Sequence, residues 1–252
     1  MDGVVMCILM VIHQCVEGYP IVLAANRDEH HDRPAQAPDV LQQSPVIWGG
    51  RDVRAGGTWL GVNEYGLVVG LTNRRMYPEQ ANDPKRRSRG LLCLDILQLR
   101  SAEAAAAFLD RVAIDLYNPF NVLTLDRDKA YWIAYDGMPQ IQRLTTGLYV
   151  LANGNLDDVE TIRIRRARHL LQRTAYTDLQ TLLPFLEEVC RDHELGVKER
   201  ETICMHRPQD NYGTVSSTIL ALSSDLRHSV YRYVDGSPCM KPYEAFSFLF
   251  QN

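Results

Sequence analysis

The fold of this chain is decided by residues 4–29, which read VVMCILMVI (4–12), HQCVEGY (13–19) and PIVLAANRDE (20–29). Two apolar runs rich in β-branched residues flank a short polar loop, a pattern that predicts a β-hairpin of two buried strands. If Ile12 pairs near Pro20, Cys7 lies opposite Ala25, within one residue. Cys7 is therefore expected beside the end of the second strand.

That second strand turns polar at Asn26, Arg27 and Asp28. A guanidinium near a thiol favours the thiolate, so Cys7 is a candidate nucleophile with a carboxylate beside it. Alternatively, Cys7 is a small buried hydrophobic residue and the polar run is only the exit turn of a strand. Hairpin geometry alone favours the second interpretation.

The composition indicates a globular protein that does not bind nucleic acid and has no transmembrane segment. The 252 residues are 46% hydrophobic, which is enough for a sizeable core, and the net charge of −4 argues against nucleic-acid binding. No apolar run approaches the roughly 20 residues that a transmembrane helix needs. The apolar run 3–12 is too short for a secretory signal and follows Asp2 rather than a basic residue. We therefore expect a cytoplasmic protein.

Six cysteines are scattered along the chain without a CxxC pair. This spacing indicates neither a disulfide framework nor a zinc site, and it suits a reducing compartment. His30 and His31 lie in the polar run 29–38, which predicts a solvated loop, because adjacent side chains point apart in most backbones. We therefore expect no metal and no cofactor.

A second hairpin is predicted where apolar runs at 58–62 and 67–72 flank the turn NEYG. Pairing about this turn puts Gly57 near Asn73. The Gly-Gly-Thr segment exposes backbone N–H groups and Asn73 supplies an amide donor, so together they could form an oxyanion hole. Equally, the glycines relax a bend and Asn73 only starts a turn.

The remaining patterns alternate between helices and strands. Helices are expected at 90–99, 101–112, 160–174 and 179–194, strand pairs within 118–137, 140–155 and 212–236, a charged loop at 196–210 and a last strand at 243–251. The helix at 160–174 is expected to place its arginines opposite an apolar face formed by Ile162, Ala167, Leu170 and Leu171.

Asn153 directly follows an apolar strand, as Asp28 and Asn73 do, so three polar strand ends could converge at one sheet edge. The order strands, two helices, strands, two helices, strands fits two antiparallel sheets between two helix layers better than βαβ units. The length and the absence of a linker favour a single domain over residues 1–252.

Eight motifs together carry a resemblance to a known family. In chain order they are Met6-Cys7-Ile8, LAANRDE (23–29) followed by RP (33–34), GGTWLGV (56–62), LTN (71–73), SRG (88–90), YNPFN (117–121), LAN (151–153) and YGT-x-SST (212–218). Nearly the whole chain resembles the NRDE family, also called Transport and Golgi organisation protein two. That family is similar to N-terminal nucleophile hydrolases, including cysteine enzymes that cut bile-salt amides and penicillin V. The resemblance implies an α+β fold, a four-layer αββα sandwich.

The resemblance also implies a role for each matching residue. Cys7 would be the nucleophile, with its own α-amino group, of pKa near ~8, as the base. Arg27 and Asp28 would poise the thiol and the amine. Asn73 and Asn153 would contact the oxyanion or the substrate amide. The substrate would further contact Asn26, Gly57, Thr58 and Trp59.

Two positions depart from the family pattern. Cys7 is preceded by MDGVVM, so its amine is free only if the chain starts at Met6 or is cut after Met6. Val215 stands in YGT-x-S where family members usually carry arginine, and Arg207 is close to it in sequence. The expected function is hydrolysis of a linear amide of a small or acylated molecule. The alternative is a non-catalytic protein that binds a lipid, acyl-CoA or haem-like ligand.

Overall fold

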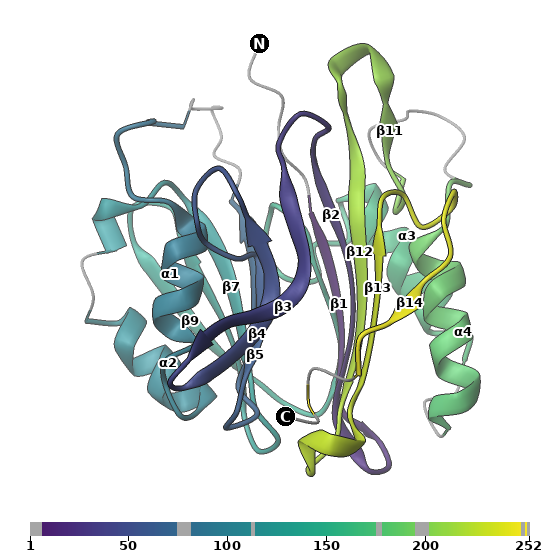
Figure 1. Ribbon diagram of the computed structural model, residues 1–252, viewed down its shortest axis with the longest axis horizontal. Coiled ribbons are helices and arrows are strands. Elements are labelled where there is room, and N and C mark those ends of the chain that lie inside the picture. The colour runs from purple at the N-terminus through teal and green to yellow at the C-terminus, as the bar shows by residue number, and fades with distance from the viewer. Residues whose placement is uncertain are drawn as a thin grey trace. The chain divides into compact units, whose positions relative to one another are not determined.

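The computed structural model describes residues 7–74, 82–111, 114–174, 178–194, 202–247 and 250. The chain divides into two compact units, each built on an antiparallel sheet with two α-helices (Figure 1). The first unit contains Arg33–Thr145, and the second contains Val5–Asp32 and Thr146–Asn252. The predicted α+β class with two antiparallel sheets is confirmed. The single-domain assignment stays a prediction.

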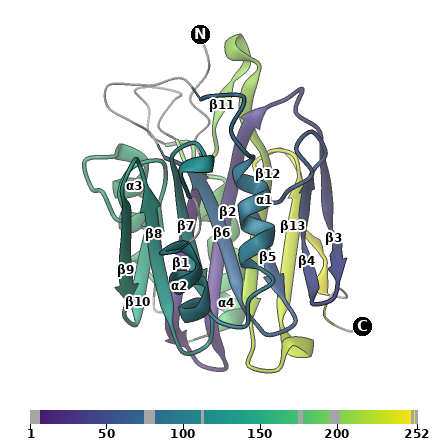
Figure 2. The same ribbon diagram turned by 90° about the vertical axis from the view of Figure 1, so that its left-hand side faces the viewer.

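The first unit is a seven-stranded sheet in simple chain order. Its strands are β3 (Ala35–Gln43), β4 (Val46–Asp52), β5 (Leu60–Asn63), β6 (Val68–Asn73), β7 (Phe120–Leu125), β8 (Ala130–Tyr135) and β9 (Pro139–Leu144). Helices α1 (Arg89–Ile96) and α2 (Ala102–Leu109) lie over this sheet, and the 3₁₀ turn η1 (Ile114–Leu116) precedes β7 (Figure 2). Alternate strand residues and the inner helix faces form its core.

The first turns of α1 and α2 are fixed by N-terminal capping residues in the sequence. The Ser88 hydroxyl accepts from the Gly90 N–H at 3.2 Å, and the Ser101 hydroxyl accepts from the Ala104 N–H at 3.1 Å. The β5–β6 hairpin pairs Leu60 with Gly70, so the predicted register of the second hairpin is confirmed.

The second unit holds the first hairpin at the centre of its sheet. The strand order is β10-β1-β2-β12-β13-β14, and β11 pairs with β12. The strands are β1 (Ile8–Val16), β2 (Tyr19–His30), β10 (Gly147–Leu151), β11 (His206–Arg207), β12 (Tyr212–Leu222), β13 (Val230–Asp235) and β14 (Glu244–Ala245). Its helices are α3 (Ile162–Leu171) and α4 (Leu179–Cys190), with the 3₁₀ turns η2 (Pro208–Asp210) and η3 (Leu226–His228).

Strand alternation decides which residues of the first hairpin face the helices. Ile8, Met10, Val22 and Ala24 pack in one core cluster with the inner residues of α3 and α4. Even-numbered positions of β1 up to Ile12 and of β2 from Val22 to Asp28 therefore face the helix layer. Among the described residues, we find no helix with the length and apolar character that crossing a bilayer requires.

The register of the first hairpin differs from the prediction by two residues. Ile12 pairs with Val22 rather than near Pro20, and Ile8 pairs with Asn26. The difference arises because the turn lies at Glu17 and Gly18, between the paired residues Val16 and Tyr19, and therefore later in the chain than predicted. A bulge between His13 and Val16, where Gln14 adopts φ 56°, shifts the register by one residue within the hairpin. A shift of two keeps every side chain on its predicted face, because strand side chains alternate with period two.

Four segment predictions are corrected. The predicted strand pair within 140–155 is not a pair, because β9 joins β8 in the first unit and β10 joins β1 in the second. The predicted loop 29–38 is mostly the end of β2 and the start of β3. The predicted loop 196–210 contains β11 and the buried residues 202–205. The last predicted strand is reduced to β14.

Some sequence predictions lie outside the described residues. They concern residues 1–6 before Cys7, the end of the second helix at 112, residues 196–201 of the predicted charged loop and the tail residues 248–249 and 251.

Candidate functional site

The candidate site lies at one edge of the second sheet, where β1 begins and β2 ends. Cys7 directly precedes β1, and Asn26, Arg27 and Asp28 lie near the end of β2. Asn26 and Asp28 face the helices. Arg27 lies on the opposite face, where its guanidinium is 4.0 Å from the Glu29 carboxylate.

Cys7 is a partly exposed residue whose thiol lies close to Asp28. Its Sγ atom is 3.9 Å from the backbone oxygen of Asp28. Burial and the negative charge of Asp28 raise the pKa of the Cys7 thiol to about 12, while the Asp28 backbone contact and the positive charge of Arg27 act in the opposite direction. The thiol is therefore protonated at neutral pH, and a nucleophilic role requires a base.

Asp28 is fully buried and held by two side chains. Its carboxylate accepts from the Arg163 guanidinium at 2.7 Å and from the Thr214 hydroxyl at 2.6 Å. Burial raises the pKa of Asp28 to about 6, even though both partners favour the charged form. The carboxyl is thus poised to change charge within a physiological pH range.

Arg163 is the functional residue that sequence reasoning missed. The expectation that every arginine of the 160–174 helix lies opposite the apolar face is wrong for this residue, which is 2% exposed. Arg163, Ala167 and Leu171 are spaced four apart, so helical periodicity places Arg163 on the buried stripe. A buried carboxylate needs a counter-charge, and Asp28 finds it there.

Hydrogen bonds extend from Asp28 to the segment before β11. Arg163 also donates to the Ile203 backbone oxygen at 3.0 Å. Thr214, which bonds Asp28, accepts from the Met205 N–H at its hydroxyl and donates its own N–H to the Met205 oxygen, each at 2.8 Å. The segment 203–205 is therefore tied to the carboxylate by two routes.

Asn26 is committed to the interior of the second unit. Its amide group donates to the backbone oxygens of Cys190 and Ile203, both at 2.9 Å, and the residue is 1% exposed. One amide hydrogen binds the end of α4 and the other binds the segment before β11, which argues against substrate contact by this NH₂ group.

Asn153 lies at the same sheet edge as Cys7. β10 and β2 are both antiparallel to β1 and flank it, so their last residues meet at the edge where β1 begins. Leu9 pairs with Leu151, which places Cys7 two positions before this pair and Asn153 two positions after it. Two of the three predicted strand ends, those at Asp28 and Asn153, therefore share an edge.

The other predicted site residues belong to the first unit. Asn73 ends β6 and pairs with Phe120. A Cβ on Gly57 would lie 2.2 Å from the Gly90 carbonyl carbon, so Gly57 permits a close backbone approach to the start of α1.

Thr58 donates its N–H to the Gly90 oxygen at 3.1 Å and its hydroxyl to the Leu60 oxygen at 3.0 Å. Both Thr58 donors thus have partners inside this unit. The Trp59 ring leaves no room for a side chain at position 50, because a Cβ on Gly50 would lie 2.5 Å from it. Substrate or oxyanion roles for Gly57, Thr58, Trp59 and Asn73 stay predictions.

Arg207 has its own partners. Its guanidinium pairs with Asp210 and lies over the Tyr212 ring at 5.5 Å. Val215 occupies the bulge where the β2–β12 register shifts between Thr214 and Ser216.

Comparison with known proteins identifies the family. A family profile described as Transport and Golgi organisation 2 matches residues 6–232 of this chain. The chain belongs to the Transport and Golgi organisation 2 family. The Mus musculus Transport and Golgi organization 2 homolog is 34% identical over 149 residues, which are 55% of this chain and 52% of that protein. The Bos taurus homolog is 28% identical over 237 residues, 82% of this chain and 83% of that protein. The alignment thus spans about half the length of the mouse relative.

Solved structures establish the fold of this family member. Penicillin V acylase from Agrobacterium tumefaciens matches with a TM-score of 0.60 at 14% identity, over 96% of this chain and 86% of that one. The N-acylethanolamine-hydrolyzing acid amidase ortholog of Caenorhabditis elegans matches with a TM-score of 0.57 at 14% identity, over 85% of this chain and 92% of that one. A conjugated bile acid hydrolase variant from Clostridium perfringens matches with a TM-score of 0.57 at 11% identity, over 95% of this chain and 96% of that one. The fold is that of N-terminal nucleophile hydrolases, so the resemblance drawn from the motifs is confirmed.

Proposed function

We propose that this family member is a cysteine amidohydrolase whose nucleophile is Cys7. The observation that carries the proposal is the placement of the Cys7 sulfur, 3.9 Å from the Asp28 backbone and within the electrostatic influence of Arg27. A thiol beside the backbone of a buried acid and under the positive charge of Arg27 is suited to nucleophilic chemistry once a base accepts its proton.

The base in this mechanism is the α-amine of Cys7, which requires that the bond between Met6 and Cys7 is cut or absent. An amine of pKa near ~8 accepts the thiol proton at neutral pH. The sulfur then attacks the amide carbonyl and forms a tetrahedral intermediate. The carbon–nitrogen bond breaks, and the leaving amine takes the proton from the ammonium group. Water hydrolyses the resulting thioester, which releases a carboxylic acid and restores the thiol.

The neighbouring residues have distinct parts in this proposal. The Arg27 charge lowers the pKa of the thiol and so favours the thiolate. Asp28, ionised above about pH 6, stabilises the positive ammonium group. The Asn153 amide, at the same sheet edge, is proposed to donate a hydrogen bond to the oxyanion, an interaction typically worth ~10²–10³ in kcat.

The substrate class is a linear amide of an acylated molecule. This part of the proposal is supported by the names of the matching structures, which are a penicillin V acylase, an N-acylethanolamine-hydrolyzing amidase and a conjugated bile acid hydrolase. The names thus describe an acylase, an amidase and a hydrolase of a conjugated acid. In the motif resemblance, the cysteine nucleophile of such enzymes corresponds to Cys7.

The proposal is tested by comparing the full chain with a form that begins at Cys7. We expect the form beginning at Cys7 to hydrolyse at least one of penicillin V, an N-acylethanolamine and a bile-salt amide. The full chain with an intact Met6–Cys7 bond should be inactive. Cys7→Ala should abolish turnover, while Cys15→Ser, at another partly exposed cysteine of the same unit, should not. Turnover that survives Cys7→Ala would contradict the proposal.

A second candidate function is ligand binding without turnover. The raised pKa of the Cys7 thiol favours this function, because a protonated thiol needs a base and the α-amine is blocked when the Met6–Cys7 bond is intact. The valine at position 215 also favours it, because valine lacks the guanidinium that family members usually carry there. Palmitoyl-CoA is a suitable probe for the lipid or acyl-CoA ligand class. A pocket binder should keep its affinity for palmitoyl-CoA after Cys7→Ala. Loss of that affinity together with the thiol would exclude simple pocket binding.

A further inference from the structure

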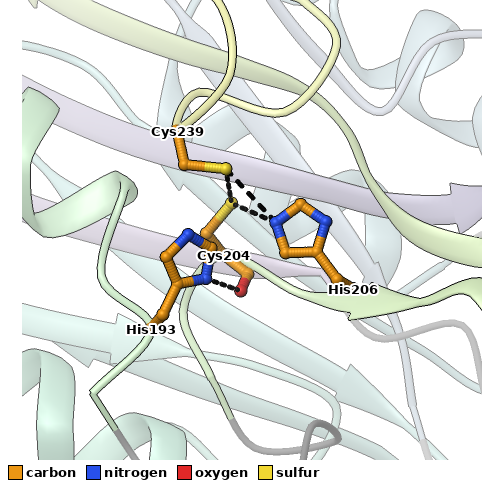
Figure 3. Close-up of side chains that lie close together, drawn as sticks. All are labelled: His193, Cys204, His206 and Cys239. Atoms are coloured by element: carbon orange, nitrogen blue, oxygen red, sulfur yellow. Dashed lines mark hydrogen bonds between the residues drawn. The ribbon is translucent and has the colours of Figure 1, made fainter.

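Four side chains of the second unit, His193, Cys204, His206 and Cys239, converge at a place apart from the candidate nucleophile. One ligand atom of each lies within 4.8 Å of the others. The two sulfurs are 3.7 Å apart, and His206 Nε2 is 3.6 Å from Cys204 Sγ and 3.2 Å from Cys239 Sγ (Figure 3). The sulfurs and the His206 ring thus point toward one common position.

These separations match the edges of a zinc tetrahedron. With Zn–S near 2.3 Å and Zn–N near 2.0–2.1 Å, tetrahedral angles give about 3.8 Å between sulfurs and about 3.5 Å between sulfur and nitrogen. The observed 3.7 Å and 3.6 Å agree closely with these values, and the 3.2 Å contact is slightly shorter. Two thiolates and two imidazoles in a tetrahedron form a donor set typical of structural Zn²⁺.

The surroundings of His193 support the same interpretation. Its Nδ1 atom lies 3.2 Å from the Cys204 backbone oxygen, a bond that holds the proton on Nδ1 and leaves Nε2 as the ligand atom. Metal-binding histidines commonly donate their second ring N–H to a backbone carbonyl in this way. The His193 and His206 rings lie 5.0 Å apart, so both can approach one ion.

Backbone and side-chain bonds hold the segments that carry these four residues. Cys204 donates its N–H to the Asp192 oxygen at 3.0 Å, which joins the residues after α4 to the segment before β11. Arg191 donates to the Pro238 oxygen at 3.0 Å, next to Cys239. The Ser237 hydroxyl donates to the Thr214 oxygen at 2.8 Å. The cluster is therefore preorganised by contacts that do not involve the ligand atoms.

We propose that His193, Cys204, His206 and Cys239 bind one Zn²⁺ ion in a closed, four-coordinate structural site. On binding, the two thiols release their protons and the two imidazoles bind as neutral ligands. Cys204 is buried, His206 and Cys239 are half-buried, and His193 is exposed, so the ion enters from the His193 side.

The site would also position Asp28. Met205 lies between the ligands Cys204 and His206, and its backbone holds Thr214, whose hydroxyl bonds the Asp28 carboxylate. An ion that fixes 204 and 206 therefore fixes the segment that orients Asp28. The proposal does not depend on the amidohydrolase function, because metal binding is measured without any substrate.

The expectation that the chain has no metal site was based on the spacing of its cysteines and histidines in the sequence. Ten residues separate His193 from Cys204, one separates Cys204 from His206, and 32 separate His206 from Cys239. No CxxC pair exists, and the segment that holds two ligands reads as a charged loop. The site becomes visible only when β11 pairs with β12 and the turn after β13 folds back.

The test uses the full chain under reducing conditions, stripped with a chelator and titrated with Co²⁺ and then Zn²⁺. We expect one equivalent of Co²⁺ to give intense tetrahedral d–d bands and a thiolate charge-transfer band, both displaced by Zn²⁺. Cys239→Ser and His193→Ala should each weaken Zn²⁺ binding more than 100-fold, beyond the ~10–100-fold typical of a lost outer partner. Neither side chain is fully buried, so these variants should fold.

Matched controls are Cys15→Ser and His169→Ala, whose side chains belong to the same unit but not to the cluster. They should bind Co²⁺ and Zn²⁺ as the unchanged protein does. A weak octahedral Co²⁺ spectrum, or Zn²⁺ affinity unchanged by Cys239→Ser and His193→Ala, would overturn the proposal. A Cys204–Cys239 disulfide in protein isolated from a reducing extract, with no metal bound, would overturn it as well.

Discussion

Asp28 is the residue that connects the proposed nucleophile to the interior of the second unit. Its backbone oxygen lies beside the Cys7 sulfur, while its carboxylate binds Arg163 and Thr214. Sequence reasoning placed Asp28 near Cys7 because the hairpin brings the two strand ends together. It did not identify Arg163 as the partner, because that contact joins residues 135 positions apart.

The raised pKa of Asp28 predicts a pH dependence of stability. The ordinary value is 3.8 and the folded value is about 6, so the folded protein holds this proton more tightly than the unfolded chain. The stability that Asp28 contributes is therefore fully present below pH 4 and is lost as pH rises through about 6. Asp28→Asn does not titrate, so urea unfolding of both proteins at several pH values isolates this contribution.

We expect the stability of the unchanged protein relative to Asp28→Asn to fall between pH 4 and pH 6. The opposite slope would mean that pairing with Arg163 and Thr214 outweighs burial. The pKa of Asp28 would then lie below its ordinary value, and the charge on Asp28 would be fixed rather than adjustable.

At the scale of elements, α3 is fastened to the sheet by one buried ion pair. Arg163→Met should destabilise the protein by about 3–5 kcal/mol, because it leaves the Asp28 carboxylate buried without a counter-charge. Chemical denaturation measures this loss. The control is Arg165→Ala on the exposed face of the same helix, which should cost less than about 0.5 kcal/mol.

The double variant Asp28→Asn with Arg163→Met should recover part of the loss, since it removes both charges. Equal effects of Arg163→Met and Arg165→Ala would show that the buried pair contributes nothing particular.

The start of α1 packs against a glycine in the segment that precedes β5. Gly57→Ala should destabilise the protein by about 1–3 kcal/mol, because the new Cβ would lie 2.2 Å from the Gly90 backbone. Gly154→Ala is a milder comparison, since its Cβ would lie 3.3 Å from a movable Asp158 side-chain oxygen. Thermal unfolding compares the two. A smaller loss for Gly57→Ala than for Gly154→Ala would refute a packing role for Gly57.

Local sequence signals predicted elements far better than they predicted partners. The two hairpins and the β5–β6 register follow from short-range chemistry. The serine caps that the structure shows at Ser88 and Ser101 have the same short-range origin. The separation of β9 from β10 could not be predicted, because both runs look like strands and only their partners differ. The bulge at Gln14 was equally hidden, since a positive φ at glutamine leaves no sequence signal.

At the scale of the whole molecule, the order of elements and the family motifs predicted the fold class correctly. The candidate site could be predicted where one hairpin carries it, at Cys7, Arg27 and Asp28. It could not be predicted where it depends on contacts between distant segments, as at Arg163 and at the cluster of His193 and Cys239.

The single-domain prediction has a direct test in denaturation. All three tryptophans, Trp48, Trp59 and Trp132, belong to the first unit, so their fluorescence reports that unit alone. Far-ultraviolet circular dichroism reports both units. A single domain predicts coincident urea midpoints for the two signals. Separate midpoints would mean that the two units unfold independently.

The central claim is that Cys7 is a reactive nucleophile beside Arg27 and Asp28. It is tested most directly by treating the form that begins at Cys7 with an electrophilic acyl probe and mapping the adduct by mass spectrometry. The account predicts one acyl group, on Cys7, in large excess over the other partly exposed cysteines Cys15 and Cys239. Labelling spread evenly over these three cysteines, or absent from Cys7, would contradict it.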